Sequence, residues 1–165
     1  MTVYTTMDSP LGELLLVGEP VGEGVALASV SVPGQKGGAI VLPEWTHDAA
    51  AFDEVATQLR EYFDGARTRF EIEFVGVGSE FQRRVWRAVE EIPYGCTATY
   101  GEIAARAGER RERVRVVAAA VGANPLLIVR PCHRVIAANG TLTGYSGGLQ
   151  RKQRLLELEH VLLPA

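Results

Sequence analysis

The first part of the chain is a series of hydrophobic, β-prone runs. Turn sequences rich in Pro and Gly separate three β-prone runs, which are residues 3–7, 13–18 and 25–32. Apolar residues then recur at helical spacing over 48–65, which predicts one amphipathic helix. Hydrophobic and polar residues alternate over 68–75, which predicts a further strand.

The pattern then changes to that of helices. Ser79 and Gln82 have the spacing of a capping box, and an apolar helical face follows over 81–92. Two shorter helices, 101–107 and 112–121, are separated by a turn and resemble a helix-turn-helix. That pattern alone is weak evidence of DNA binding, because short motifs recur in unrelated proteins.

These elements predict an α+β fold with two domains joined at Gly76-Val77-Gly78. Residues 1–78 form a small β-rich domain with one helix. Residues 79–165 form a mostly helical domain that contains a winged helix-turn-helix-like motif.

The composition is that of a globular protein. The chain has 165 residues, of which 47% are hydrophobic and 22% charged, and this excludes a disordered tail protein. No apolar run approaches the roughly 18 residues of a membrane span, and the amino terminus lacks a basic-then-apolar signal pattern. We expect a soluble, cytoplasmic protein that does not contact a membrane.

The net charge of -3 hides a strong asymmetry along the chain. Residues 1–80 hold 4 Lys and Arg against 13 Asp and Glu, whereas residues 81–165 hold 13 against 7. A basic half is typical of a protein that binds a polyanion such as DNA. Well-solvated Arg-rich helices would give the same count, so charge alone does not choose between the two.

The two cysteines, Cys96 and Cys132, form no C-x-x-C pair and no disulfide framework. We interpret Cys96 as structural. Cys132 ends an apolar run, 124–135, that predicts a strand, and it is followed by His133 and Arg134, the residue types that lower the pKa of a nucleophilic thiol. Neighbouring strand residues diverge, so a water is expected to bridge Cys132 and His133. The competing interpretation is a buried small residue beside a capping histidine.

The last helix, predicted over 148–160, carries a carboxylate inside its leucine stripe. Glu159 lies between Leu155 and Leu156 in the helical projection, and a buried carboxylate requires a partner. His133 is one candidate, which would give a Cys, water, His, Glu relay. A structural pair of Glu159 with Lys152 or an arginine is the other.

Several spaced motifs between Ser79 and Glu159 resemble the O6-alkylguanine-DNA alkyltransferase family. They are Asn124-Pro125, Pro131-Cys132-His133-Arg134-Val135 and Gly144-Tyr145-Ser146-Gly147-Gly148-Leu149. The resemblance implies irreversible, stoichiometric transfer of an alkyl group from guanine O6 to a cysteine. It also implies a monomer that binds double-stranded DNA containing alkylated guanine, with no cofactor.

The resemblance further implies roles for individual residues. Cys132 would be the acceptor, His133 the water-mediated base and Glu159 its orienting carboxylate. Asn124 would be the hinge between the helix-turn-helix and the active-site segment, and Tyr100 would protonate the leaving guanine or displace its phosphate.

Further residues would contact DNA or the alkylated base. Arg115 matches the arginine that fills the gap left by a flipped nucleotide, at the start of the second helix of the motif. Arg110 and Arg111 would contact phosphates, and Ala118 and Ala119 would face the groove. The substrate-binding residues would be Tyr145, Ser146 and Val135.

The sequence departs from the family at four positions. Arg130 stands where an aliphatic residue is usual, Val114 and Val116 replace alanines, and Ala118 replaces a glycine. Because a bulkier helix face changes how the helix docks on DNA, we expect these changes to affect DNA binding more than the chemistry. The cysteines that bind zinc in some members are absent, so no metal is expected.

Three other functions compete. A lesion-binding relative without transfer activity would lack the acceptor cysteine, which is present here. A cysteine hydrolase using Cys132, His133 and Glu159 would turn over repeatedly. A transcriptional regulator would need a dimerisation or effector element, which the sequence does not indicate.

Overall fold

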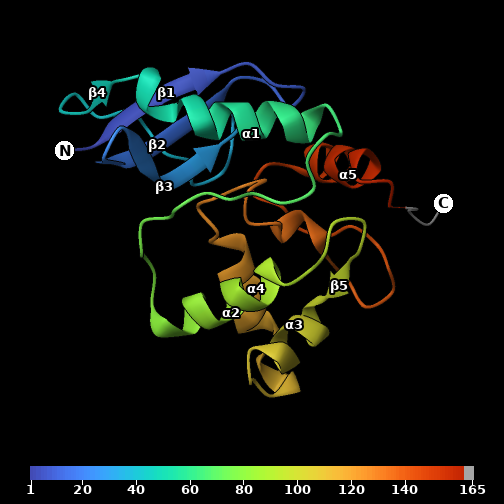
Figure 1. Cartoon of the computed structure of the whole chain (residues 1–165). Helices are drawn as coiled ribbons and strands as arrows, with labels where there is room; N and C mark the ends of the chain where they lie inside the picture. Colours follow the sequence, from blue (N-terminus) through green and yellow to red (C-terminus); the bar gives the residue numbers. More distant parts are fainter. Residues whose placement is uncertain (162–165) are drawn as a thin grey trace. The chain divides into compact units, whose positions relative to one another are not determined.

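The computed structural model describes residues 1–161 and divides the chain into two compact units, Met1–Gly76 and Val77–Ala165 (Figure 1). The first unit holds the sheet and the second holds most of the helices, so the predicted α+β fold is confirmed. Among residues 1–161, no helix is long and apolar enough to cross a membrane.

The first unit is built on a four-stranded sheet in the order β3-β2-β1-β4. Strands β1 (Val3–Met7), β2 (Leu14–Val21) and β3 (Gly24–Ser31) are antiparallel, and the short β4 (Thr46–His47) pairs with β1 in parallel. Register shifts at Val17/Gly18, where a Cβ on Gly18 would lie 2.6 Å from the Ala26 carbonyl oxygen. Only glycine therefore permits this close approach of β2 and β3.

One helix accompanies the sheet. A 3₁₀ turn, η1 (Ala50–Phe52), leads into α1 (Asp53–Phe63), which buries Val55, Leu59 and Tyr62 on one face. The predicted helix is thus present, and it ends before Gly65, whose φ of 78° stops the helical geometry.

The predicted strand over 68–75 is wrong. This segment makes one bridge to β3, in which Leu27 N donates to Glu73 O and Val75 N donates to Leu27 O. The backbone of Glu71 instead pairs with the side-chain amide of Gln58 on α1, at 2.8 and 3.1 Å. A helix side chain therefore satisfies backbone groups that a neighbouring strand would otherwise need to meet.

The second unit opens with α2 (Glu80–Glu90), whose predicted capping box between Ser79 and Gln82 is present. The helix-turn-helix pair is α3 (Tyr100–Arg106) and α4 (Val114–Gly122), with a 3₁₀ turn, η2 (Arg111–Arg113), before α4. A two-stranded parallel sheet, β5 (Ala98–Thr99) and β6 (Val135–Ile136), contacts α3. Helix α5 (Leu149–Leu158) completes the unit.

Helices α2, α3 and α4 share one apolar core. Its fully buried members include Val85, Val89, Ile103 and Val117. Because this core fixes the two helices of the motif against α2, it also fixes the segment that leaves α4 and carries Cys132.

The predicted strand over 124–135 is wrong for most of its length. Leu126 to Val129 are buried in a turn, in which Arg130 N donates to Leu126 O at 2.9 Å, and Ile128 has a φ of 73°. A further 3₁₀ turn, η3 (Cys132–Arg134), precedes β6. An apolar run that is buried on all sides carries no alternation, so hydrophobicity alone does not separate a strand from a buried turn.

Candidate active site

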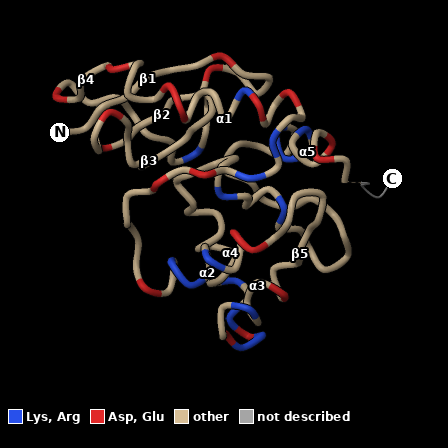
Figure 2. Tube along the Cα trace, in the orientation of Figure 1, with Lys and Arg blue, Asp and Glu red and all other residues tan. Residues whose placement is uncertain are grey.

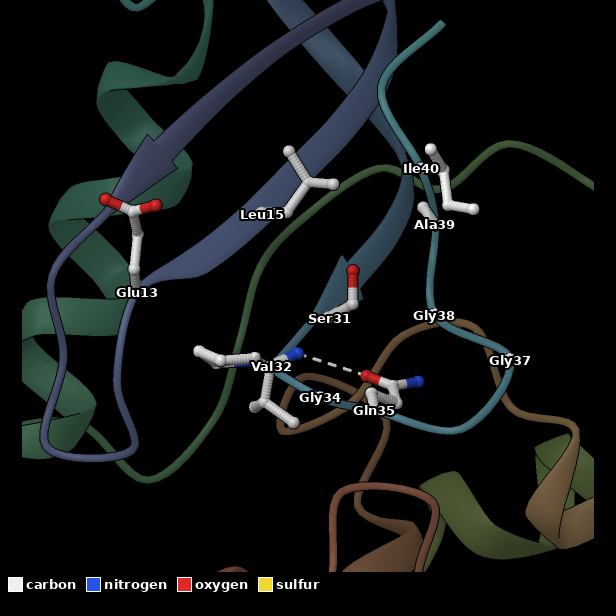
Figure 3. A pocket seen from close by; sticks show the side chains of 11 residues that line it. Glu13, Leu15, Ser31, Val32, Gly34, Gln35, Gly37, Gly38, Ala39 and Ile40 are labelled. Atoms are coloured by element: carbon white, nitrogen blue, oxygen red, sulfur yellow. Dashed lines mark hydrogen bonds between the residues drawn. The ribbon is translucent and has the colours of Figure 1, made fainter.

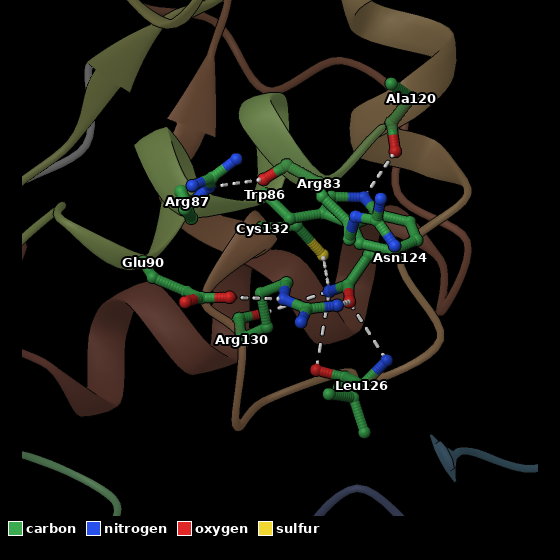
Figure 4. Close-up of polar contacts among 9 residues, drawn as sticks. All are labelled: Arg83, Trp86, Arg87, Glu90, Ala120, Asn124, Leu126, Arg130 and Cys132. Carbon is green, nitrogen blue, oxygen red and sulfur yellow. Dashed lines mark hydrogen bonds and ion pairs between the residues drawn. The ribbon is translucent and has the colours of Figure 1, made fainter. Parts of the chain in front are cut away.

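Cys132 is the first residue of η3 and is 5% exposed. Its backbone N donates to Arg130 O at 2.7 Å, and Nδ2 of Asn124 donates to its Sγ at 3.1 Å (Figure 4). The fold therefore presents this thiol on a tight turn, with one amide N–H aimed at the sulfur.

Asn124 holds that turn together. Its Oδ1 accepts from Leu126 N at 2.9 Å, and its Nδ2 donates to Arg130 O at 3.0 Å and to Leu126 O at 3.3 Å. The side chain is 2% exposed. Asn124 lies just after α4 in the chain. It therefore connects the end of the helix-turn-helix to residues 126–132, which we call the cysteine turn, and this is the position of a hinge residue.

His133 and Glu159 form a buried pair. The ring Nε2 lies 2.8 Å from Glu159 Oε2, and both side chains are fully buried. Glu159 also accepts from Arg134 Nε at 2.7 Å and from Nη2 at 3.0 Å. Burial raises the pKa of Glu159, but the hydrogen bonds from His133 and Arg134 have the larger combined effect and lower the pKa to about 2.

This pairing determines which nitrogen of His133 can act as a base. An ionised carboxylate only accepts hydrogen bonds, so Nε2 carries the proton that it donates to Glu159. The other nitrogen, Nδ1, is buried and has no hydrogen-bond partner among residues 1–161. Burial lowers the pKa of His133, so the ring is neutral and Nδ1 presents a lone pair.

The expectation that neighbouring residues lower the pKa of the Cys132 thiol is wrong for this state of the protein. Burial raises that pKa to about 11, against the hydrogen bond from Asn124 and the charges of Lys152 and Arg130. The adjacent Arg134 directs its guanidinium to Glu159 and to Ile92 O. Cys132 is therefore a thiol at rest and becomes a nucleophile when a base removes its proton.

The proposed pairing of Lys152 with Glu159 is wrong as well. Lys152 Nζ donates to three backbone carbonyl oxygens, those of Val135 at 2.6 Å, Thr143 at 3.0 Å and Gly144 at 3.2 Å. Burial lowers its pKa to about 8, and the Cys132 charge opposes that shift. Lys152 thus anchors the loop that carries Tyr145, while Glu159 takes both His133 and Arg134.

The two tyrosines lie near the thiol. Tyr100 begins α3 and its hydroxyl donates to Thr143 O at 3.2 Å, whereas the Tyr145 hydroxyl is buried without a partner among the described residues. Burial, followed by the charge of Cys132, raises the pKa of Tyr145, and burial is also the largest cause of the raised pKa of Tyr100. Ser146 is half-buried beside Tyr145, and Val135 is fully buried in β6.

The residues predicted to contact DNA lie before α4, at its start and in its middle. Arg110, Arg111 and Arg115 are exposed, as are Val116 and Ala119, while Ala118 is half-buried. Figure 2 shows that Lys and Arg gather at this end of the second unit and along α2. The α2 arginines Arg83 and Arg87 are exposed too and were not among the predicted site residues.

Sequence reasoning missed Trp86 and Glu90, the two residues of α2 that contact Arg130. Arg130 is 8% exposed, its Nε donates to Glu90 Oε2 at 2.7 Å, and its guanidinium lies 4.6 Å from the ring centroid of Trp86. A charged residue at the end of an apolar run was the available signal, because a buried cation requires partners.

A cavity in the first unit has a volume of about 520 Å³ (Figure 3). Leu15, Ser31 and Ile40 are among its lining residues, and none of the predicted site residues lines it. Cys96 is a free, exposed cysteine, and its interpretation as structural stays a prediction. Among residues 1–161, no cluster of three or more His, Cys, Asp or Glu could hold a metal ion.

Two family models match the chain. Residues 2–75 match the ribonuclease-like domain of 6-O-methylguanine DNA methyltransferase, and residues 80–161 match the DNA binding domain of the same family.

Individual proteins match over nearly the full length. A methylated-DNA--protein-cysteine methyltransferase of Mycolicibacterium paratuberculosis is 48% identical, covering 100% of this chain and 96% of that protein. A protein of the same name from Methanosarcina acetivorans is 43% identical over 94% of this chain and 97% of its own length.

A solved structure matches equally well. The crystal structure of Mycobacterium tuberculosis OGT in complex with DNA superposes with a TM-score of 0.85 at 45% identity, covering 95% of this chain and 92% of that one. The O6-methylguanine methyltransferase of the same organism gives a TM-score of 0.84 over 100% of this chain and 96% of its own.

Proposed function

Because the chain belongs to the 6-O-methylguanine DNA methyltransferase family, it repairs DNA by transferring an alkyl group from O6-alkylguanine to a cysteine, and we propose that this cysteine is Cys132. The resemblance seen in the sequence is thereby confirmed. The observation that carries the assignment is the environment of the sulfur. Cys132 Sγ accepts a hydrogen bond from Asn124 Nδ2, and Cys132 directly precedes His133, whose Nε2 is hydrogen-bonded to Glu159.

The reaction is a displacement at a saturated carbon. The Cys132 sulfur forms a bond to the alkyl carbon while the bond from that carbon to guanine O6 breaks, and the electron pair stays on the guanine. The proton of the thiol passes, through a bridging water, to the free Nδ1 of His133. No metal or organic cofactor is needed for this step.

Glu159 acts once His133 is protonated. Its carboxylate stabilises the imidazolium and keeps Nε2 as the donor, and Arg134 fixes the carboxylate through two hydrogen bonds. Glu159 therefore contributes to the transition state more than to the binding of the lesion.

The departing guanine requires a proton donor. The hydroxyl of Tyr100 is held at Thr143 O, close to the loop that bears Tyr145 and Ser146. We assign to Tyr100 the donation of a proton to the leaving base, and to Tyr145, Ser146 and Val135 the contacts that hold that base.

The helix-turn-helix docks on the DNA. Arg115, exposed at the start of α4, enters the stack that the flipped nucleotide leaves, and Arg110 and Arg111 contact phosphates. Ala118 and Ala119 allow α4 to approach the groove closely. The protein acts as a monomer in the cytoplasm, a reducing compartment that suits its two free cysteines.

Intact-protein mass after incubation with a duplex that contains O6-methylguanine tests this proposal. We expect the mass to rise by one methyl group per molecule, with peptide mapping placing the methyl on Cys132. Cys132→Ser should gain no methyl, whereas Cys96→Ser should behave as the wild type. A methyl on Cys96, lesion binding without transfer, or repeated turnover on the substrate would each contradict it.

A further inference from the structure

Arg130 is a buried cation two residues before Cys132. A guanidinium that is 8% exposed must be compensated, and here Glu90 Oε2 accepts from its Nε at 2.7 Å. The ring of Trp86 supports its face at 4.6 Å. The side chain is therefore held from two directions.

Both supports come from one face of α2. Trp86 and Glu90 are one helical turn apart, and Trp86 is itself fixed because its Nε1 donates to Ala120 O on α4 at 2.9 Å. The planar guanidinium is thus clamped between an anion and an anchored ring, which leaves its Nη1 edge in a defined place (Figure 4).

That edge reaches the residue that contacts the acceptor thiol. Arg130 Nη1 donates to Asn124 Oδ1 at 3.4 Å, and Nδ2 of the same carboxamide donates to Cys132 Sγ at 3.1 Å. A positive charge on the oxygen side of an amide draws electron density from its nitrogen and makes its N–H a stronger donor. The strengthened donor faces the sulfur.

We propose that Arg130 is a positioning residue for alkyl transfer, which acts through Asn124 to stabilise the Cys132 thiolate. This inference rests on the proposed function of Cys132. The sulfur is neutral at rest and negative as it attacks, so the bond from a polarised Asn124 N–H is stronger in the transition state than in the ground state. The charge of Arg130 also opposes the effect of burial on the pKa of Cys132.

The test uses iodoacetamide, a small neutral electrophile that reacts with the thiolate without DNA. Alkylation of Cys132 is followed by mass spectrometry with peptide mapping, as a function of pH, in the full-length protein. Arg130→Met should raise the apparent pKa of the thiol by about half a unit to one unit. Because a more basic thiolate is also more nucleophilic, the net slowing near neutral pH should be about two- to fourfold.

Two further variants separate polarisation from packing. Arg130→Lys keeps a cation and should recover part of the lost rate. Arg67→Met removes an arginine that pairs with Glu61 at 3.0 Å in the first unit, and it should leave the pH profile of Cys132 unchanged. Thermal unfolding of each variant identifies any loss of rate that comes from a damaged fold.

A double variant tests the route through Asn124. In the background of Asn124→Ala, Arg130→Met should cause little additional slowing, because the donor that it polarises is gone. Should Asn124→Ala fail to fold, the side-chain amide signals of Asn124 in NMR spectra of wild type and Arg130→Met report the same interaction.

A wild-type pH profile in Arg130→Met overturns the proposal. So does an equal slowing at every pH in Arg130→Met and Arg130→Lys, which would indicate a packing role. These outcomes are distinguishable from a failure of the proposed function, because that function is tested with lesion DNA and fails if the DNA leaves Cys132 unmodified or is turned over repeatedly.

Discussion

Glu159 lies 2.8 Å from Nε2 of His133 with both side chains fully buried, and this contact orients the imidazole that follows Cys132 in the chain. The same carboxylate holds Arg134, so it is shared between a reacting residue and a structural one. Replacing it therefore has both a kinetic and a structural consequence.

Glu159→Gln is expected to slow alkyl transfer while leaving lesion binding largely intact, because a neutral amide stabilises the imidazolium less than a carboxylate does. Single-turnover transfer rates and DNA-binding affinities measure the two effects. Glu157→Gln, at an exposed position on α5 two residues before Glu159, is the matched control. Wild-type transfer in Glu159→Gln would return Glu159 to a structural role.

The acid stability of the protein should reflect the same residue. The pKa of Glu159 is lowered in the folded protein from its usual 4.5 to about 2. Between these two pH values the folded protein therefore binds fewer protons than the unfolded chain does. The associated stability, on the order of 3 kcal/mol, is present above pH 4.5 and is lost as the pH falls towards 2. Urea unfolding at a series of acidic pH values should show a steeper decline for the wild type than for Glu159→Gln.

Arg115→Ala should impair repair of a lesion in duplex DNA far more than reaction with the free alkylated base. Only the duplex requires a base to be extruded and its gap to be filled. The half-buried Val114 and the exposed Val116 flank Arg115, and their bulk sets how closely α4 approaches the stack. Equal losses on the duplex and on the free base would show that Arg115 supports the fold instead.

Arg110→Ala or Arg111→Ala should weaken binding to all duplexes, damaged or not. Both side chains are exposed before α4, where a phosphate contact is electrostatic and independent of sequence. Each lost contact should reduce the slope of log affinity against log salt by about one unit. An unchanged slope would place these arginines outside the DNA interface.

Most of the fold follows from local signals in the sequence. The strands of the first unit are hydrophobic runs bounded by turn residues, and Ser79 and Gln82 mark the start of α2 through bonds within one turn. The segments over 68–75 and 124–135 do not form the predicted strands, because amide side chains take part of their backbone hydrogen bonding: Gln58 accepts from Glu71 N, and Asn124 accepts from Leu126 N. Hydrogen bonds between an amide side chain and the backbone leave no periodic pattern in a sequence.

The parts of the site that could be predicted are those that neighbouring residues in the sequence indicate. The Cys132-His133 pair and the buried Glu159 could be identified, since a carboxylate inside an apolar stripe must have a partner. The role of Arg130 could not, because it depends on Trp86 and Glu90, which lie about forty residues earlier and meet it only in the folded unit. Likewise, the raised pKa of Cys132 is a property of burial that the basic neighbours in the sequence do not indicate.

The φ of 73° at Ile128 shows that the cysteine turn would not persist outside this fold. A buried β-branched residue in that conformation costs of order 1–3 kcal/mol, and the surrounding core supplies the contacts that hold it there. A short peptide with the sequence Pro131-Cys132-His133-Arg134 would relax, and its thiol would react as an ordinary cysteine. The four-residue sequence therefore identifies the activity, but the activity itself depends on the folded unit around these residues.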